Sequence, residues 1–503
     1  LLCYLLVLVG LAGYGFHRLS IVYLYWKNRN NKPQPKSRFQ ELPVVTVQLP
    51  MFNEKFVVDR LLESVAALDY PQDKLEIQIL DDSTDDTTEQ CYRKVEELKS
   101  RGFDAVCIHR TDRTGFKAGA LEAATKVAKG EFLLILDADF VPEPDLLQKT
   151  IHFFTDENVG LVQTRWGHIN REYNLLTRIQ GMYLDGHFAM EQTARNRSGR
   201  FFTFNGTAGI WRKCVIGDAG GWSHDTLTED MDLSYRVQLR GWRFIYLNDV
   251  VTPAELPVDM DGFKSQQHRW TKGSIQVCQK ILLDIWRSNA PLKAKVEATT
   301  HLTCNYSYLL LALLCFLVYP ICTQRIPENE TVFMWFVNVA LFFMTSVAVC
   351  IFYMSAQIVV RPKSWWKELP YLPLLLTLSV GMAVNNAKAV LEAIFGHQSA
   401  FVRTPKYGVD RKEDRRHVSQ LKRNGYRAIK SVVIPVLEIA CGTFFLNLII
   451  IMIRQGHYLS PILMIPFLGF YYTGFCSLGR MISNLLPAKQ TAKAKNCPLS
   501  HAC

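Results

Sequence analysis

The sequence predicts an α/β domain with a mainly parallel sheet, joined to a bundle of membrane-spanning helices that includes interfacial helices. Between about residues 43 and 293, short apolar runs such as "VVTVQLP" and "EFLLILDADF" alternate with helical stretches such as "KAGALEAATKVA". This alternation is typical of βαβ units, which build parallel sheets. The rest of the chain carries apolar runs that are long enough to cross a bilayer.

The first apolar run, residues 1–26, is followed by a cluster of basic side chains. Its length and its basic end are typical of a transmembrane helix, and no small-residue cleavage site of a signal peptide follows it. We therefore predict an N-terminal transmembrane helix in residues 1–30 and place the α/β domain in residues 40–257.

The C-terminal part of the chain, residues 301–503, contains further apolar runs. Four of them predict membrane spans, namely 304–323, 332–354, 431–453 and 459–480. The run 369–395 differs because it carries polar and charged side chains that are costly in lipid unless they face protein or water, namely Asn385, Asn386, Lys388 and Glu392.

Basic residues are concentrated in the linkers 355–367 and 402–430. Positive charge marks cytoplasmic loops, and a single crossing by 369–395 would put these two linkers on opposite sides of the membrane. We therefore predict that 369–395 is interfacial or re-entrant and that the α/β domain is cytoplasmic. The protein would then be a multi-pass membrane protein of the bacterial inner membrane or of the eukaryotic Golgi or plasma membrane.

The chain has a net charge of +11, which would suit nucleic acid, anionic lipid headgroups or a phosphorylated substrate. The positive charge lies in loops beside the membrane, where the lipid bilayer is a sufficient partner, so we expect no binding of nucleic acid. The 13 cysteines show no repeated CxxC spacing, so the sequence indicates neither a zinc site nor a disulfide framework.

Acidic residues follow two predicted strands. Asp81 and Asp82 end "LEIQILDD", and Asp137 and Asp139 end "EFLLILDAD". Such residues also form turns, but two pairs in one α/β domain indicate a shared site at the carboxyl edge of the sheet. An Asp-x-Asp pair offers oxygen ligands to Mg²⁺ or Mn²⁺, and a nucleotide diphosphate would complete the coordination.

A third acidic cluster contains Glu229 and Asp230 in "HDTLTEDMDL". Asp230 stands at a predicted helix start, so it would be either a helix N-cap or a general base that takes a proton from an attacking hydroxyl. Lys117 lies in a glycine-containing loop before a helix, a setting that suits phosphate. Asn205 and Gly206 lie in the turn-rich "FFTFNGTAGIWRK", which by itself indicates no function.

The stretch "SQQHRWTKGS" lies in residues 258–300, which we predict to form interfacial helices. If it is helical, Gln266, Arg269 and Trp270 share one face. Arginine can bind a pyrophosphate through two hydrogen bonds, and tryptophan offers a flat face for a sugar ring. The same residues would equally suit an interfacial helix whose Trp and Arg mark the headgroup level.

Seven motifs in a fixed order make the reading more specific: "PMFNE", "DDSTDDT", "GFKAGAL", "DAD", "FNGTAGIWR", "TED" and "QQHRW". This series resembles the family 2 processive glycosyltransferases of the cellulose synthase and cellulose synthase-like group, in particular the smaller mannan- or glucan-synthase-like members. The resemblance covers residues 40–300 closely. It extends to "FVRTPK" at 401–406, which is similar to the family's gating loop.

The resemblance implies a GT-A domain, which binds a nucleotide sugar, docked on a membrane channel. The implied donor-binding residues are Asp81, Asp82, Lys117, Asp137, Gln266 and Arg269. Asp137 and Asp139 would hold the metal, Asp230 would be the catalytic base with Glu229 beside it, and Trp270, Asn205 and Gly206 would bind the acceptor. Phe401, Thr404 and Lys406 would belong to the gating loop.

The expected activity is that of an inverting, processive β-glycan synthase, a hexosyltransferase. It would transfer sugar from UDP-glucose or GDP-mannose to a growing polysaccharide acceptor (glucan, mannan or glucomannan) and translocate the polymer. The alternative is a glycolipid synthase that acts on a membrane lipid, which "FVRTPK" disfavours. A non-catalytic receptor is disfavoured by the intact carboxylates. The donor sugar, the linkage and the oligomeric state stay open.

Overall fold

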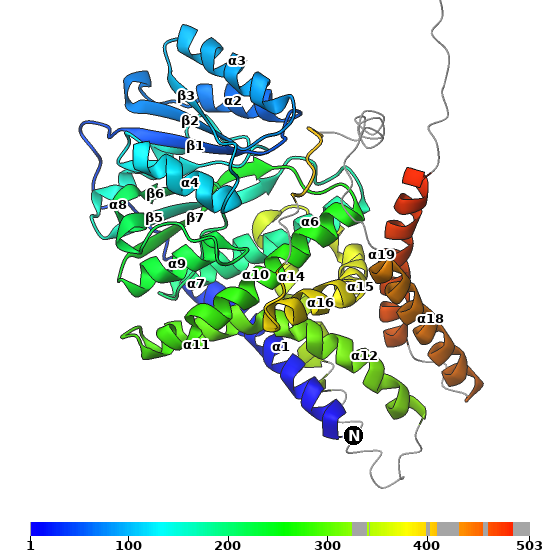
Figure 1. The fold of residues 1–503 in the computed structure, drawn as a ribbon. Helices are drawn as coiled ribbons and strands as arrows, with labels where there is room; N and C mark the ends of the chain where they lie inside the picture. Colours follow the sequence, from blue (N-terminus) through cyan, green and yellow to red (C-terminus); the bar gives the residue numbers. More distant parts are fainter. Residues whose placement is uncertain are drawn as a thin grey trace, which may run out of the picture.

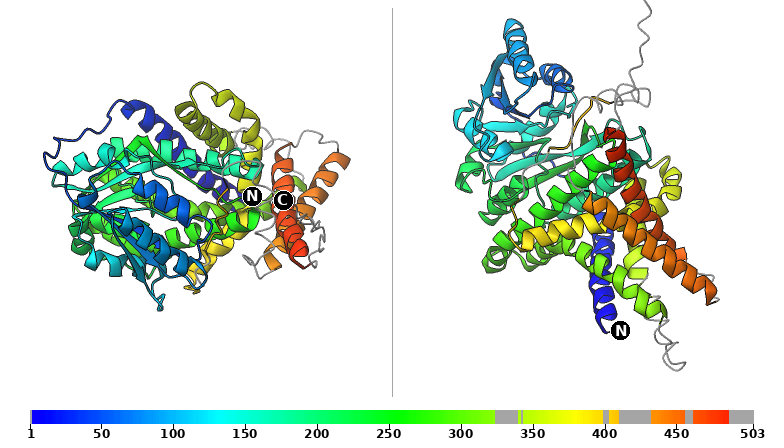
Figure 2. Two further views of the ribbon diagram at one scale, coloured as in Figure 1. Left: turned by 90° about the horizontal axis from the view of Figure 1, so that it is seen from above. Right: turned by 45° about the vertical axis from the view of Figure 1, so that its right-hand side comes forward.

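The computed structural model describes residues 2–323, 340–341, 343–398, 403–409, 432–455 and 461–485. Within these residues an α/β domain lies on one side, and long helices project away from it on the other (Figure 1). The two further views show the same division, with α1, α12 and α18 directed away from the sheet (Figure 2).

The sheet of the α/β domain has seven strands in the order β3-β2-β1-β4-β6-β5-β7. Their bounds are β1 (Val45–Met51), β2 (Leu75–Asp81), β3 (Asp104–His109), β4 (Phe132–Ile135), β5 (Val159–His168), β6 (Gly209–Arg212) and β7 (Arg243–Ala254). Strand β6 runs antiparallel to β4 and β5, and the other pairs are parallel. The predicted mainly parallel sheet is therefore confirmed.

Helices cover both faces of the sheet, so strands such as β1 and β2 are buried along almost their whole length. Apolar side chains of α2 (Val58–Ala66), α3 (Thr87–Ser100) and α5 (Leu146–Thr150) pack on one face. Those of α4 (Phe116–Val127), α8 (Lys213–Asp218) and α9 (Glu229–Leu239) pack on the other. The loops at the carboxyl ends of the strands remain available for a site.

A second group of helices joins this domain to the rest of the chain. It consists of α6 (Leu175–Asp185), the π-helix η3 (Gly186–Gln192), α7 (Thr193–Arg197), α10 (Met260–Arg287) and α11 (Leu292–Thr303). Helix α10 begins after Asp259, whose side chain accepts a hydrogen bond from the Gly262 N–H at 2.9 Å. The predicted helix through "SQQHRWTKGS" is therefore confirmed.

Three described helical segments are long and apolar enough to cross a membrane: α1 (Leu2–Asn28), the continuous run Leu292–Cys322 that includes α12 (Ser307–Thr323), and α18 (Val433–Arg454). They expose large apolar side chains, for example Leu2, Phe16, Phe316 and Val433. A contiguous apolar surface of this kind is stable against lipid and unfavourable in water.

The other expected spans are described in part. The predicted span 332–354 lies partly outside the described residues, and its described end forms η5 (Phe343–Val347) and α14 (Ala348–Val360). Helix α19 (Pro461–Leu485) covers the predicted span 459–480, although it is not among the three segments above. Its C-terminal part contacts the start of α10, because Arg480 bonds Asp259.

The segment 369–395 forms a bent pair of helices. The runs Trp365–Gly381, with η6 (Trp365–Tyr371) and α15 (Leu372–Gly381), and Ala383–Ile394, which is α16, meet at an angle of 41°. The polar side chains of α16 face α10: Asn385 Nδ2 donates to the Lys264 carbonyl at 3.2 Å, and Glu392 contacts His268 and Lys272. An interfacial or re-entrant position stays a prediction, and these contacts explain how polar residues are accommodated here.

Candidate active site

The carboxylate of Asp137 lies two residues beyond β4, at the carboxyl edge of the sheet. Lys117, in the first turn of α4, places its Nζ 2.5 Å from Asp137 Oδ1 and 2.8 Å from the Gly206 carbonyl oxygen. The Asp137 N–H donates to Thr207 Oγ1 at 2.8 Å. Two loops that are distant in the sequence are thereby held around one carboxylate.

Gly206 allows the close approach of these loops. Its φ of +81° favours glycine, and a Cβ at this position would lie 3.1 Å from Asp230 Oδ2 and 3.6 Å from Lys117 Nζ. Asp137, Lys117 and Asp230 therefore surround the same short stretch of backbone. The turn-rich motif that indicated no function by itself is the piece that brings the predicted site residues together.

Asp139 is buried and bonds the ammonium group of Lys406. Burial lowers the pKa of Lys406, but Asp139, Glu54 and Asp137 outweigh it and raise the pKa above its ordinary value. In the same way burial raises the pKa of Asp137, while Lys117 and Lys406 outweigh it and hold the pKa below its ordinary range. Asp137 is therefore charged, and each of the two carboxylates is paired with a lysine ammonium group.

Asp230 is the second residue of α9, and Thr228 occupies the N-cap position, so the alternative of an N-cap role for Asp230 is wrong. Its Oδ1 accepts a hydrogen bond from the Met231 N–H at 2.8 Å. Burial and the neighbouring Glu229 carboxylate raise the pKa of Asp230 to about 7. A carboxylate with such a pKa is suited to accept a proton at neutral pH.

Helix α10 brings Arg269 and Trp270 to the same region, and Gln266 lies about one turn before Trp270 on that helix. Burial lowers the pKa of Arg269, while the carboxylates of Glu229, Asp137 and Asp230 act in the opposite direction, so the guanidinium group lies in the field of the acidic site. Trp270 lines a cavity that also contains Asp230. The hypothesis that Trp270 and Arg269 only mark the level of the lipid headgroups does not explain these positions.

Asp81 ends β2, Asp82 follows it directly, and both contact residues at the end of the neighbouring strand β3. Asp81 is fully buried and accepts hydrogen bonds from the Ser83 N–H, Thr88 Oγ1 and His109, at 3.0, 2.7 and 2.7 Å. Asp82 forms a bidentate pair with Arg110 at 2.8 and 2.6 Å. These pairs order the edge of the sheet beside the Asp137 site, and contact with a nucleotide base stays a prediction.

Asn205 is oriented by two neighbours that the sequence did not single out. Gln192 Nε2 donates to Asn205 Oδ1 at 2.5 Å, and Asn205 Nδ2 lies 2.9 Å from His187 Nε2. Burial, with Arg195 and Arg18 nearby, lowers the pKa of His187 to about 3, so its imidazole is neutral. No local motif marks His187 or Gln192, because only the π-helix η3 places them beside Asn205.

The described segment 403–409, which includes residues 403–406 of the predicted gating loop, lies against the same edge of the sheet. Thr404 is buried there, and Phe401 lies outside the described residues. Arg403 donates to the Phe52 carbonyl at 2.7 Å and lies 3.3 Å from Glu54. The motif "PMFNE" thus serves as a docking surface for this segment, a role that the sequence did not reveal.

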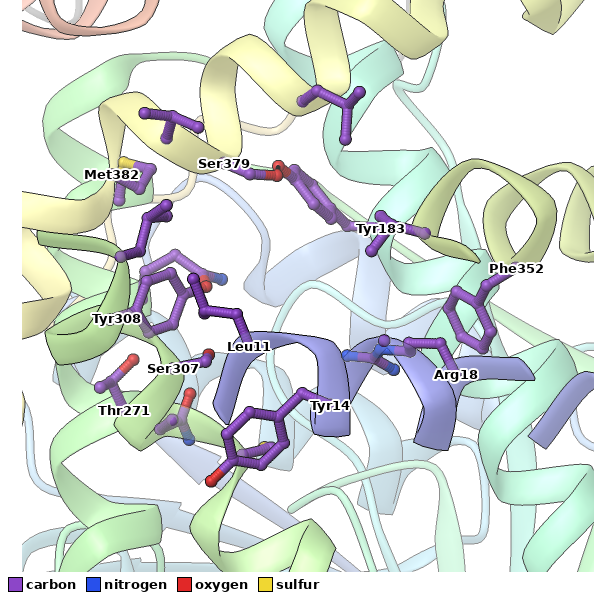
Figure 3. Close-up of a pocket in the computed structure, with 18 of the residues that line it drawn as sticks. Leu11, Tyr14, Arg18, Tyr183, Thr271, Ser307, Tyr308, Phe352, Ser379 and Met382 are labelled. Atoms are coloured by element: carbon purple, nitrogen blue, oxygen red, sulfur yellow. Dashed lines mark hydrogen bonds between the residues drawn. The ribbon is translucent and has the colours of Figure 1, made fainter. Parts of the chain in front are cut away.

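A cavity of about 1040 Å³ extends from this site towards the membrane helices. It is lined both by the site residues Asp230, Trp270 and Asn205 and by residues of the long apolar helices such as Leu463. Polar and aromatic side chains from several helices also line it, among them Tyr14, Arg18, Tyr183, Tyr308 and Ser379 (Figure 3). Its mixed lining suits a ligand with both hydroxyl groups and apolar faces.

The side chains of the site can be compared with the ligands that a divalent cation requires. Within the described residues no group of three or more His, Cys, Asp or Glu side chains could hold a metal ion. Asp137 and Asp139 nevertheless fit Mg²⁺ or Mn²⁺, because such ions commonly bind one or two carboxylates and take further oxygens from water and substrate phosphates. In this structure the ammonium groups of Lys117 and Lys406 supply the positive charge beside Asp137 and Asp139, respectively.

Two families match the chain, described as "Glycosyltransferase like family 2" over residues 43–273 and "Cellulose synthase" over residues 209–455. Glucomannan 4-beta-mannosyltransferase 2 of Arabidopsis thaliana is 42% identical over 286 residues, which are 54% of this chain and 53% of that protein. Glucomannan 4-beta-mannosyltransferase 1 of Oryza sativa subsp. japonica is 40% identical over 277 residues, with the same coverage. The chain thus spans about half the length of the curated relatives that it matches.

A solved structure, that of a mannosyltransferase from Pyrobaculum calidifontis in complex with GDP-Man and Mn²⁺, resembles this chain with a TM-score of 0.53. The two are 19% identical, and the match covers 78% of this chain and 100% of that one. At this identity the likeness concerns the fold, and the α/β domain has the GT-A fold. The two matches overlap and together extend from residue 43 to residue 455, so the chain carries a glycosyltransferase family 2 domain and a cellulose synthase domain.

Proposed function

We propose that this chain is a membrane-embedded, inverting and processive β-glycan synthase that passes its product through the membrane helices. One observation carries the proposal: a single cavity contains both Asp230, the candidate base, and the side chains of the membrane helices. A polymer whose end lies at Asp230 has a continuous path away from it. The catalytic domain would then lie on the cytoplasmic side, where the donor is available.

The reaction is a single displacement. Asp230 takes the proton of the acceptor hydroxyl, the freed oxygen attacks the anomeric carbon of the donor, and the bond to the diphosphate breaks with inversion. Glu229 supports this step by keeping the pKa of Asp230 high. Trp270 packs against the acceptor sugar, while Asn205, fixed by His187 and Gln192, supplies a hydrogen bond.

Positive charge offsets the charge that grows on the leaving diphosphate. Arg269 and Lys117 are suited to this role, because both lie in the field of Asp137. A divalent cation held by Asp137 and Asp139 would supply Lewis-acid stabilisation of the diphosphate. Lys406 would then leave Asp139 for the phosphate oxygens, which is a short movement for a flexible side chain.

The donor is GDP-mannose, and the product contains β-linked mannose. This part of the proposal is supported by two relatives at 40–42% identity, both named glucomannan 4-beta-mannosyltransferases. UDP-glucose would be a second donor if the product is a mixed glucomannan. The bilayer, the nucleotide sugar and the polysaccharide are the partners that this function requires.

The decisive experiment offers GDP-mannose, UDP-glucose and UDP-N-acetylglucosamine to the purified protein in lipid nanodiscs, with Mg²⁺, with Mn²⁺ or with a chelator. We expect a water-insoluble or long soluble product from GDP-mannose that a β-mannanase degrades, and little product with the chelator. Product that partitions into organic solvent would instead identify a lipid acceptor. Single-sugar products would contradict processive synthesis.

A further inference from the structure

Glu255 lies at the end of β7, one residue beyond Ala254, and its carboxylate is buried under the segment 403–409. Three consecutive backbone N–H groups of that segment donate to it. Tyr407 N lies 3.0 Å from Oε1, and Gly408 N and Val409 N lie 3.0 and 3.2 Å from Oε2. Three donors on one carboxylate form a built docking point, since charge-assisted hydrogen bonds are the stronger kind.

The segment is shaped to make these bonds. Gly408 has a φ of +67°, and a Cβ there would lie 2.8 Å from the Phe56 carbonyl oxygen. Glycine is therefore required for the chain to turn its N–H groups towards Glu255. On the other side Arg60 Nη2 lies 3.6 Å from Glu255 Oε2, so a cation of α2 faces this buried carboxyl group.

The neighbouring side chains anchor the same segment. Tyr407 and Val409 are buried and pack with Tyr173 and Val258. The Tyr407 hydroxyl lies 3.5 Å from Asp259, the residue that caps α10. The docking point is thus continuous with the helix that carries Gln266, Arg269 and Trp270.

The position of Lys406 follows from these contacts. It precedes Tyr407 directly, and its ammonium group bonds Asp139. We propose that Glu255 is a positioning residue, which docks the segment 403–409 and thereby holds Lys406 at the diphosphate side of the site. The inference rests on the proposed function, since Lys406 at Asp139 matters for the reaction only if a nucleotide sugar binds there.

The first test measures the docking itself, without any substrate. Hydrogen exchange of the peptide that contains Tyr407 to Val409 is compared in the wild type and in Glu255→Gln, in nanodiscs. The amide can accept at only one of its two heavy atoms, so exchange of these N–H groups should rise about tenfold or more. Gly408→Ala, which perturbs the segment instead of the carboxylate, should give the same increase.

Glu76→Gln is the matched control. Glu76 is equally buried, and it accepts hydrogen bonds from Thr46 Oγ1 at 2.6 Å and from the Lys129 N–H at 2.8 Å, at the amino end of β2. Exchange of the segment 403–409 should be unchanged in this variant. Equal exchange in Glu255→Gln and the wild type would overturn the proposal.

The second test asks whether Glu255 acts through Lys406. Glu255→Gln should raise the KM for the nucleotide sugar about tenfold with a smaller effect on kcat, and the same substitution in a Lys406→Met background should change KM less than about twofold. Additive effects would show that Glu255 acts otherwise and would overturn the inference. If the wild type consumes no nucleotide sugar, the proposed function fails, while the exchange result still decides the docking.

Discussion

The ammonium group of Lys117 lies 2.5 Å from the Oδ1 atom of Asp137 and joins α4 to the loop beyond β4. It bonds the Gly206 carbonyl as well, so a single side chain connects the expected donor side of the site with the expected acceptor side. This contact explains why a lysine in the first turn of a helix, a common surface position, is part of the candidate active site.

Replacement of this lysine should weaken donor binding. Lys117→Met removes a charge-assisted hydrogen bond, and we expect the affinity for the nucleotide sugar to fall about tenfold to a hundredfold. Calorimetry or a filter-binding assay measures the loss. Lys126→Met, on the same helix but with a side chain that is 71% exposed, should bind the donor normally. Equal affinities of the two variants would contradict the assignment.

Asp230→Asn should separate binding from chemistry. The amide fills the same space but cannot take a proton, so we expect transfer to fall by about 10²–10⁴-fold with donor affinity little changed. Asp218→Asn is the control, because Asp218 is exposed and its carboxylate accepts a hydrogen bond from Trp242 Nε1 at 2.8 Å. Turnover by Asp230→Asn at close to the wild-type rate would exclude Asp230 as the base.

The activity should depend on pH through Asp230. Burial and Glu229 raise its pKa to about 7, and only the deprotonated carboxylate can act as a base. The value of kcat/KM should therefore rise through about pH 7 and fall about tenfold per unit at lower pH. Glu229→Gln removes the like charge, so the acidic limb of its profile should move to lower pH. An unchanged limb would show that another group controls the profile.

Obstruction of the cavity should shorten the product. Ser379 lines the cavity opposite Tyr14 and beside Tyr183, and a tryptophan there would fill the passage (Figure 3). We expect Ser379→Trp to bind the donor and to release oligosaccharides, which size-exclusion chromatography of labelled product would detect. Leu374→Trp, on the exposed face of the same helix α15, should make polymer of normal length. Long polymer from Ser379→Trp would contradict passage through the cavity.

Much of the fold could be predicted because the pattern that predicts it is local. The alternation of strands and helices follows from short-range hydrophobic periodicity, and it indicated a parallel sheet with Asp81 and Asp137 at its carboxyl edge. The antiparallel strand β6 was not anticipated, since pairing of Gly209–Arg212 with β4 and β5 depends on residues far away in the chain.

The contacts within the membrane region were harder to predict from the sequence than the α/β domain. Hydropathy identified α1, α12 and α18, and their length and apolar surface agree with that prediction. It could not indicate that Asn385 and Glu392 of α16 would bond α10, because polar residues in an apolar run are explained only by the partners that surround them.

The sequence by itself determined which side chains are candidates for the chemistry of this protein. The carboxylates at strand ends, Asp230 and the "QQHRW" helix are short motifs, whose residue types already limit what they can bind or exchange. The tertiary structure decided which groups act together. Gly206 meeting Lys117 and Asp230, His187 holding Asn205, and Glu255 receiving the N–H groups of Tyr407 to Val409 all join segments separated by long stretches of chain. Such contacts follow from how the chain packs in three dimensions, which no local pattern records.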